Sequence, residues 1–407
     1  MKITAVETLR LKRHGTLIWI RLHTDEGITG LGESWFGAST IETDIHDRIA
    51  PTLLGENPSR IEYLNRKMRP YVGFFGTSAE IRALSAADVA LWDIAGKVAN
   101  KPVCDLLGGK TRDKVQLYNT CAGPDYVSTS SDVRPDNFGL DASKQGEGAK
   151  TKTDRYEDLT GFMNNPVEVA ASLLDMGISS MKIWPFDFAQ GAVDGVDIST
   201  EDLKRGLKPF EDIRKAHGGK MRLKAELHGI WSLPAAKKIC RALEPIGMDW
   251  IEDPIWMDRI HDLRELSEAT SAPLAGGETL GGLGQFRELI EQGAISNPII
   301  DVTWGGGLTF AKKAAGIAEA SARSIAFHDC SGPVTLAVST HLALSSPNIW
   351  EQEFTRAFYY GWYHTLLNQL PPIENGFITV PEGAGLGVEL KEGLENEHDA
   401  ISRITRL

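Results

Sequence analysis

The chain has 407 residues, of which 42% are hydrophobic and 24% charged, so it can form two or three domains around a large core. Its formal net charge of −12 argues against a nucleic-acid-binding surface, which needs clustered basic residues. No apolar run reaches the ~20 residues of a membrane helix, and the start lacks the apolar stretch of a signal peptide. The four cysteines form no C-x-x-C pair, so we expect no disulfide or zinc site and a reducing, cytoplasmic location.

The N-terminal part of the chain reads as a small α+β domain. Polar and apolar residues alternate, as in half-buried strands, over residues 3–10 and 17–24. Residues 30–37 (GLGESWFG) are rich in turn formers and predict a mobile loop with exposed aromatic side chains. Apolar residues recur at helical spacing over residues 79–99, which end just before a helix stop, Asn100-Lys101-Pro102.

From Val115 onward, short apolar strands alternate with amphipathic helices. The predicted strands are 115–121, 178–184, 221–227, 249–252, 272–278, 299–303, 324–328 and 348–353. The predicted helices are 166–176, 201–217, 233–244, 283–292, 308–321 and 333–344. This alternation favours an α/β fold, a closed parallel (β/α)8 TIM-type barrel. An open doubly wound sheet is the alternative, but no G-x-G-x-x-G follows the first strand.

The predicted domains are an α+β capping domain over residues 1–114, completed by the C-terminal segment 380–407, and a barrel over residues 115–379. The barrel carries an insertion, residues 124–165, which is polar and longer than loops without a function usually are. Because it follows a strand, it should lie over the face where barrel active sites are built. A surface insertion with no role fits loop statistics equally well.

Ionisable residues fall at or just past the predicted strand ends: Lys182, Glu226, His228, Glu252, Glu278, Asp301, His328 and Glu353. The glutamates at 226, 252 and 278 are 26 residues apart, one strand–helix unit each, so they should converge at one mouth of the barrel. Three converging carboxylates repel one another unless a divalent cation neutralises them, and oxygen ligands favour Mg²⁺ over zinc. A single glutamate at a strand end is more often a solvated residue, but three equivalent ones indicate a metal site.

The histidines at strand ends suggest acid–base chemistry. Asp301 and His328 come from neighbouring strands, so the aspartate could orient the imidazole and raise its basicity, although His328 alone fits a structural role equally well. His228 shares a strand face with Glu226, and Lys182 shares one with Trp184. Lys182 could contact a substrate carboxylate or a metal-site glutamate. We expect the remaining candidates to be surface residues: His14, His46, His217 and His261.

Three motifs resemble the enolase superfamily, specifically its mandelate racemase/muconate lactonizing enzyme branch. They are ALSAADVALWDIAGKVANKPVCDLLGG (83–109), WIEDP (250–254) and the GGE of LAGGETLGGL (274–283). The resemblance implies a cap over a barrel whose acids bind Mg²⁺, with a base that removes the proton α to a substrate carboxylate. It places Glu226, Glu252 and Glu278 at the metal positions, the first of which is more often Asp. It also matches Asp301 and His328 to a His–Asp dyad and Glu353 to an acid that hydrogen-bonds the substrate.

Two further motifs separate the activities within this branch. Its racemases and cycloisomerases carry K-x-K on the second barrel strand, which here reads Lys182-Ile183-Trp184. Glu226-Leu227-His228-Gly229 resembles instead the D-x-H-G motif of acid-sugar dehydratases of the galactonate dehydratase type, whose histidine protonates the departing 3-hydroxyl. A base and an acid at different places suit α-proton removal followed by loss of hydroxide.

The resemblance therefore implies dehydration of a sugar acid to a 2-keto-3-deoxy sugar acid. His328 would be the base, Asp301 would orient it, His228 would be the acid, and Lys182, Glu353 and Mg²⁺ would stabilise the enediolate. We expect Trp184, Trp35 and Phe36 to contact the substrate, and residues 30–37, 70–76 and 124–165 to shape specificity and exclude water. The alternatives are a racemase or epimerase with His228 as second base, and a non-catalytic sugar-acid or metal binder. Relatives are commonly symmetric, so a homo-oligomer is expected.

Overall fold

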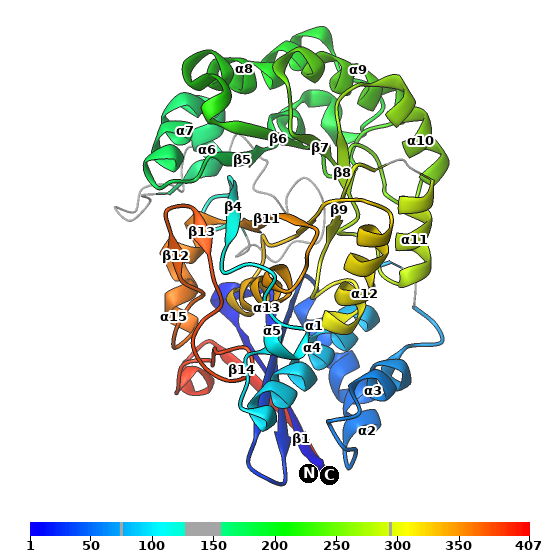
Figure 1. Cartoon of the computed structure of the whole chain (residues 1–407), viewed down its shortest axis with the longest axis vertical. Helices are drawn as coiled ribbons and strands as arrows, with labels where there is room; N and C mark the ends of the chain where they lie inside the picture. The colour runs from blue at the N-terminus through cyan, green and yellow to red at the C-terminus, as the bar shows by residue number, and fades with distance from the viewer. Residues whose placement is uncertain (74–75, 127–155, 293–294) are drawn as a thin grey trace.

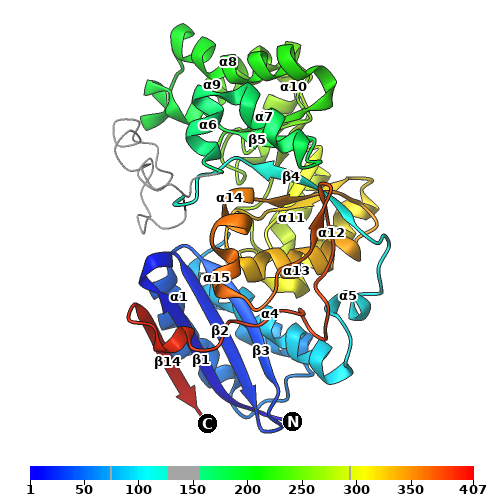
Figure 2. The same ribbon diagram turned by 90° about the vertical axis from the view of Figure 1, so that its left-hand side faces the viewer.

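The computed structural model of the chain, which describes residues 1–73, 76–126, 156–292 and 295–407, consists of an antiparallel-sheet domain and a parallel barrel (Figure 1). The two termini lie side by side at the end of the sheet domain remote from the barrel (Figures 1 and 2). They meet because the last strand pairs with the first, from Ala5 opposite Arg406 to Leu11 opposite Ala400.

The sheet domain has four strands in the order β14-β1-β2-β3, and its helices cover one face of the sheet (Figure 2). The strands are β1 (Ile3–Leu11), β2 (Leu17–Thr24), β3 (Thr29–Trp35) and β14 (Ala400–Arg406). The helices are α1 (Ala38–Asp44), α2 (Ala50–Leu53), α3 (Ile61–Met68), α4 (Ala79–Ala99) and α5 (Val103–Leu106). Helix α4 spans the predicted residues: Ser78 caps its first turn, and Asn100 ends it in the left-handed conformation.

The prediction of a mobile loop over residues 30–37 is wrong, because most of the segment is the buried strand β3. Its glycines permit the close approach of α4 rather than a turn. A Cβ on Gly30 would lie 2.1 Å from the carbonyl oxygen of Ala90, and one on Gly32 would lie 2.0 Å from that of Ala86. Trp35, expected to be exposed, is buried.

The barrel is closed by the pairing of its first and last strands, β4 and β11. Its strands are β4 (Val115–Thr120), β5 (Ser180–Ile183), β6 (Arg222–Glu226), β7 (Trp250–Glu252), β8 (Leu274–Gly276), β9 (Asn297–Ile300), β10 (Ile325–Phe327) and β11 (Ile349–Phe354). Its outer helices are α7 (Pro166–Asp175), α8 (Thr200–His217), α9 (Leu233–Leu243), α10 (Ile260–Ala269), α11 (Leu283–Glu291), α12 (Gly307–Ala320) and α13 (Pro333–Leu344). The predicted capped (β/α)8 barrel is therefore confirmed.

Shorter helices and strands, besides single 3₁₀ and π turns, lie between these elements. They are α6 (Asp158–Asn164), α14 (Arg356–Phe358), α15 (His364–Leu366) and the hairpin of β12 (Ile373–Glu374) and β13 (Phe377–Ile378), which pairs with β4. Of the predicted insertion 124–165, residues 127–155 lie outside the described part, as do residues 74 and 75 of the segment 70–76. All four cysteines are buried and free, and no helix among the described residues could cross a membrane.

Two buried carboxylates join the sheet domain to the barrel. Glu33 on β3 accepts hydrogen bonds from the backbone N–H of Thr335 at 2.8 Å and from its hydroxyl at 2.7 Å, in the first turn of α13. Asp88 on α4 accepts one from the N–H of Thr309 at 2.9 Å, in the first turn of α12. These hydrogen bonds satisfy backbone N–H groups that have no partner within the first turn of a helix, so they hold the cap over the two strands that precede α12 and α13.

The expectation that His14 and His46 are surface residues is wrong. His46 is 3% exposed, and its two ring nitrogens lie 2.8 Å from the hydroxyls of Thr8 and Thr405. His14 stacks on Trp362 with ring centroids 4.5 Å apart, and burial lowers its pKa to about 4. Both histidines are buried by residues distant in sequence, which the pattern of their own segments could not indicate.

Candidate active site

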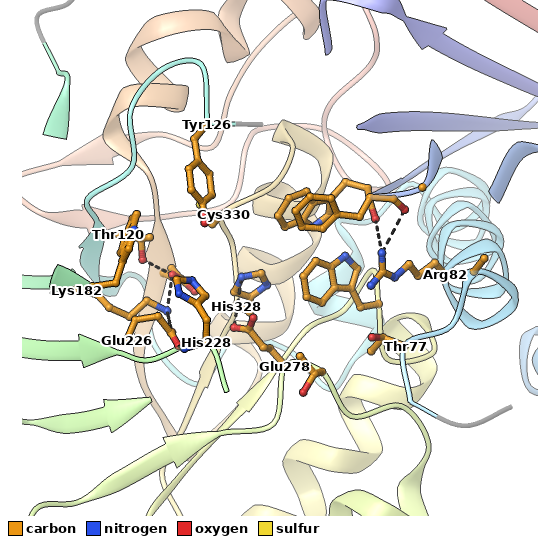
Figure 3. Close-up of a pocket in the computed structure, with 18 of the residues that line it drawn as sticks. Thr77, Arg82, Thr120, Tyr126, Lys182, Glu226, His228, Glu278, His328 and Cys330 are labelled. Atoms are coloured by element: carbon orange, nitrogen blue, oxygen red, sulfur yellow. Dashed lines mark hydrogen bonds and ion pairs between the residues drawn. The ribbon is translucent and has the colours of Figure 1, made fainter. Parts of the chain in front are cut away.

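A cavity of about 440 Å³ lies between the carboxyl ends of the barrel strands and the cap. The barrel supplies its charged side, with Lys182, Glu226, Glu278, His328 and Glu353, and the cap closes it from the side opposite (Figure 3). Barrel active sites are built at this end of the strands. The cavity is therefore where chemistry is expected.

Three glutamates converge at the base of this cavity. Glu226 and Glu252 end the neighbouring strands β6 and β7 and are opposite each other in register, and Glu278 follows β8. One carboxylate oxygen from each lies within 4.8 Å of the others, and all three side chains are buried. The parallel pairing of neighbouring strands therefore brings together residues that are 26 positions apart in the chain.

Lys182 on β5 is in ionic contact with several of the buried carboxylates. Its Nζ lies 2.6 Å from Glu252, 3.0 Å from Glu353 and 3.2 Å from Glu226. Burial opposes its charge, but these carboxylates raise the pKa of Lys182 well above its usual range. Glu353 also accepts hydrogen bonds from the Thr120 hydroxyl and, at 3.0 Å, from the backbone N–H of Asp329.

The three glutamates fit a hard divalent cation. Among the described residues, Lys182 and the His328 imidazole are the basic groups in contact with these glutamates and Glu353, so carboxylates outnumber basic groups at this point. Burial, together with repulsion from neighbouring carboxylates, raises the pKa of Glu252 and of Glu278, whereas Lys182 and His228 outweigh burial and lower that of Glu226 to about 2. An all-oxygen donor set with surplus negative charge suits Mg²⁺ rather than zinc.

His328 and Asp301 form a buried pair beside these glutamates. Nδ1 of His328 lies 2.6 Å from Asp301 Oδ2, and its Nε2 lies 3.5 Å from Glu278 Oε2. Burial alone would lower the pKa of His328, but Glu278, Glu353 and Asp301 raise it well above its usual range. The other oxygen of Asp301 accepts hydrogen bonds from the N–H and hydroxyl of Thr303 and from the N–H of Trp304, so the aspartate is fixed.

His228 has an equivalent partner that the sequence did not reveal. Its Nδ1 lies 2.5 Å from Oδ2 of Asp187, a buried residue in the turn after β5. The backbone of His228 is left-handed, with φ +48°, and its N–H donates to Glu226 Oε1 at 2.7 Å. This uncommon conformation directs the ring toward the loop that carries Asp187. Two histidines, each with a carboxylate on Nδ1, therefore line one cavity.

Aromatic side chains form the wall between the charged side of the cavity and the cap. Trp35 stacks on Phe36 at 3.9 Å and lies 5.0 Å from Trp304, which is 5.1 Å from the His328 ring. Arg82 on α4 lies over Trp304 at 4.6 Å and donates to the carbonyl oxygens of Trp35 and Phe36 at 3.2 Å each (Figure 3). These contacts attach the end of β3 to the cap helix.

The structure brings the predicted site residues into one region. Nine line the cavity: Lys182, Trp184, Glu226, His228, Glu278, His328, Glu353, Trp35 and Phe36. Glu252 and Asp301 lie behind the lining, where they bond to Lys182 and His328. Sequence reasoning missed Asp187, Arg82, Thr120 and Trp304. Trp304 lies just past the end of β9, and Thr120 is the last residue of β4, so both could have been found by including uncharged residues at strand ends. Asp187 lies in a turn and Arg82 on the cap.

Two family models match the chain. Residues 3–108 match the N-terminal domain of mandelate racemase/muconate lactonizing enzymes, and residues 166–394 match the enolase C-terminal domain-like family. Among curated proteins, the chain is similar to a D-galactonate dehydratase of Ralstonia nicotianae, with 29% identity over 406 residues. That match covers 97% of this chain and 93% of the relative.

Solved structures agree with these matches. An enolase of the mandelate racemase subgroup from Agrobacterium tumefaciens is 42% identical, with a TM-score of 0.87, over 100% of this chain and 99% of that one. An enolase protein from Sargasso Sea environmental sequencing is 37% identical, with a TM-score of 0.87 and the same coverage. The similarity therefore extends through both the cap and the barrel.

Proposed function

The chain belongs to the enolase superfamily, in its mandelate racemase/muconate lactonizing enzyme branch, and on that basis we propose that it is a Mg²⁺-dependent dehydratase of a sugar acid. The product would be a 2-keto-3-deoxy sugar acid. One observation carries the proposal: two histidines, each backed by an aspartate, line a single cavity beside three glutamates. Dehydration needs a base for the α-proton and a separate acid for the departing hydroxyl.

Proton removal is assigned to His328. Its Nδ1 is held by Asp301, and Nε2 would take the α-proton of a bound carboxylate once Mg²⁺ held by Glu278 offsets the negative charge that raises the pKa of His328. Glu226, Glu252 and Glu278 would hold the Mg²⁺, which when bound would supply positive charge beside the substrate carboxylate as negative charge develops there. Lys182 would donate to that developing negative charge, and Glu353 would hydrogen-bond the substrate.

Proton donation is assigned to His228. Because Asp187 holds Nδ1, Nε2 of His228 would carry the proton to the 3-hydroxyl, which leaves as water. His228 follows β6 and His328 follows β10, so the proposed acid and base stand on different strands of the barrel. The two steps would then use the same cavity without competing for one side chain.

The cap and Trp184 would determine which sugar acid fits. Trp35 and Phe36 close the cavity from the cap, and Trp184 packs edge-on against His228 with ring centroids 5.8 Å apart. Aromatic faces suit the C–H surface of a sugar chain, and the cover would exclude water during proton removal. D-Galactonate is the first compound to test, since a relative of similar length is named for its dehydration.

The test is a panel of sugar acids, D-galactonate included, incubated with protein and Mg²⁺ and assayed for 2-keto acids with semicarbazide. We expect at least one acid to give a keto product, and we expect both His328→Ala and His228→Ala to abolish it. Absence of any keto acid across a broad panel would contradict the proposal. Binding of a sugar acid without any turnover would indicate the non-catalytic binder instead.

Epimerisation at the carbon α to the carboxylate is the second candidate. It is favoured by the Asp187–His228 pair, which gives His228 the same support that Asp301 gives His328 and would let it act as a second base. The two candidates differ in deuterium oxide. An epimerase returns deuterated substrate and its isomer with no keto acid, whereas a dehydratase accumulates the keto acid.

A further inference from the structure

We propose that Trp250 is a positioning residue for the metal site, because its indole N–H fixes the carboxylate of Glu252. The inference rests on the Mg²⁺ site of the proposed function. It concerns a residue that lies below the cavity lining, in the interior of the barrel. The residue acts on the metal only through the glutamate.

The geometry places the indole directly against the carboxylate. Trp250 and Glu252 are two residues apart on β7, so both side chains point into the barrel. The Nε1–H of Trp250 donates to Glu252 Oε2 at 2.8 Å, while Lys182 donates to Oε1 at 2.6 Å. Each oxygen keeps a second lone pair, so the two donors set the plane of the carboxylate and leave it able to bind a cation.

The indole of Trp250 is itself held in place by Lys224 and Tyr118, which pack against it inside the barrel. Nζ of Lys224 lies 4.2 Å from the Trp250 ring centroid, and the edge of Trp250 meets Tyr118 at 5.3 Å and an interplanar angle of 90°. Lys224 is in turn paired with Glu351 at 2.7 Å and with Asp249 at 3.2 Å. A cation over the face of an indole draws electron density toward it and strengthens the N–H as a donor.

A purely packing role would not need this hydrogen bond. Phenylalanine at position 250 would keep most of the buried surface but leave Glu252 Oε2 without its donor. Groups that orient metal ligands typically contribute about 10- to 100-fold to metal affinity. Loss of the N–H should therefore weaken metal binding while the barrel stays folded.

The experiment measures Mg²⁺ affinity by calorimetry on metal-free protein, with no substrate. We expect Trp250→Phe to weaken Mg²⁺ binding about 10- to 100-fold. Trp350→Phe is the matched control, because Trp350 packs against Trp250 at 5.3 Å. Among the described residues it donates no hydrogen bond to the three glutamates. We expect the Kd of the control variant for Mg²⁺ to lie within about twofold of the wild-type value. This difference is well below the effect of losing a group that orients a metal ligand.

Equal affinity of Trp250→Phe and wild type would overturn the inference, as would equal weakening in Trp350→Phe. If Trp250→Phe does not fold, benzothienylalanine at position 250 replaces only the N–H by sulfur and gives the same test. Failure of the wild type to bind Mg²⁺ would be a different result. It would contradict the metal site of the proposed function and remove the inference with it.

Discussion

Two layers of the barrel interior each contain a buried lysine, yet the two layers differ in their balance of acidic and basic side chains. Lys182 and Lys224 are opposite each other in register on β5 and β6. Lys182 belongs to the mouth cluster, which we define as Lys182, Glu226, Glu252, Glu278 and Glu353. Lys224 belongs to the floor cluster, Arg222, Lys224, Asp249 and Glu351.

The floor cluster has two basic side chains for two carboxylates, whereas the mouth cluster has one lysine for four carboxylates, with the His328 imidazole 3.5 Å from Glu278 as a second basic group in contact with it. Burial lowers the pKa of Lys224 to about 7 despite Asp249, but the surplus carboxylates overcome burial and raise that of Lys182. Basic side chains thus match carboxylates in number in the floor, whereas carboxylates outnumber basic groups in the mouth. Under the proposed function the mouth is the part that binds a cation, whereas the paired charges of the floor hold neighbouring strands together.

The largest effect should come from removing the base. We expect His328→Asn to lower turnover of the sugar acid by roughly 10²- to 10⁴-fold, the usual contribution of a general base. Floor contacts are untouched, so thermal unfolding should change little. Steady-state assays and circular dichroism on the same preparation check both parts. Turnover within a few-fold of the wild type would remove His328 from the chemistry.

Neutralising one carboxylate in each cluster compares the layers directly. Glu351→Gln should cost about 3–5 kcal/mol of unfolding free energy, because it leaves buried cations without their partner. Glu252→Gln should leave the metal-free protein as stable as the wild type or more so, since it relieves repulsion. Urea unfolding in EDTA measures both. A larger loss in Glu252→Gln than in Glu351→Gln would reverse the comparison.

Metal addition should stabilise the protein through the mouth alone. At a Mg²⁺ concentration of 100 times Kd, the folded state should gain about 2.7 kcal/mol. The Glu351→Gln variant, although less stable than the wild type without metal, should gain the same unfolding free energy from Mg²⁺. The Glu278→Gln variant should gain little. Thermal unfolding with and without Mg²⁺ is the measurement. A gain that survives Glu278→Gln would place the bound ion elsewhere.

The smallest effect should come from removing the carboxylate that holds His228, the proposed general acid. Asp187→Asn leaves His228 in the cavity but removes the carboxylate on its Nδ1. We expect dehydration to slow about tenfold, equivalent to about 1.4 kcal/mol, while deuterium exchange at the α-carbon continues. Proton NMR in deuterium oxide follows both. Equal losses of exchange and dehydration would mean that Asp187 serves the fold rather than the acid.

The convergence of the three glutamates could be predicted because their signal repeats along the chain. Each of Glu226, Glu252 and Glu278 ends or follows a strand one repeat unit from the next, and the parallel pairing of these neighbouring strands brings them together. The barrel was predictable for the same reason. The floor cluster also left a signal, since Arg222 and Lys224 alternate with apolar residues on a short strand, but these charges do not identify their partners.

The remaining contacts depend on features with no periodic pattern. Asp187 lies in a single turn after β5, and its meeting with His228 requires a left-handed residue in the next loop. Gly30 and Gly32 suggested a loop, because the sequence does not show that α4 packs within contact distance of β3. Arg82 reaches the cavity only through the docking of the cap, which no local pattern specifies.

The most direct test of the account is to locate the cation. Crystals of the protein grown with Mn²⁺ in place of Mg²⁺ would give an anomalous signal at each bound ion. We expect one strong peak among the carboxylate oxygens of Glu226, Glu252 and Glu278, and none in the floor cluster. A mouth without a peak at saturating Mn²⁺, or a peak held by other residues, would contradict the assignment of the three glutamates as the metal site.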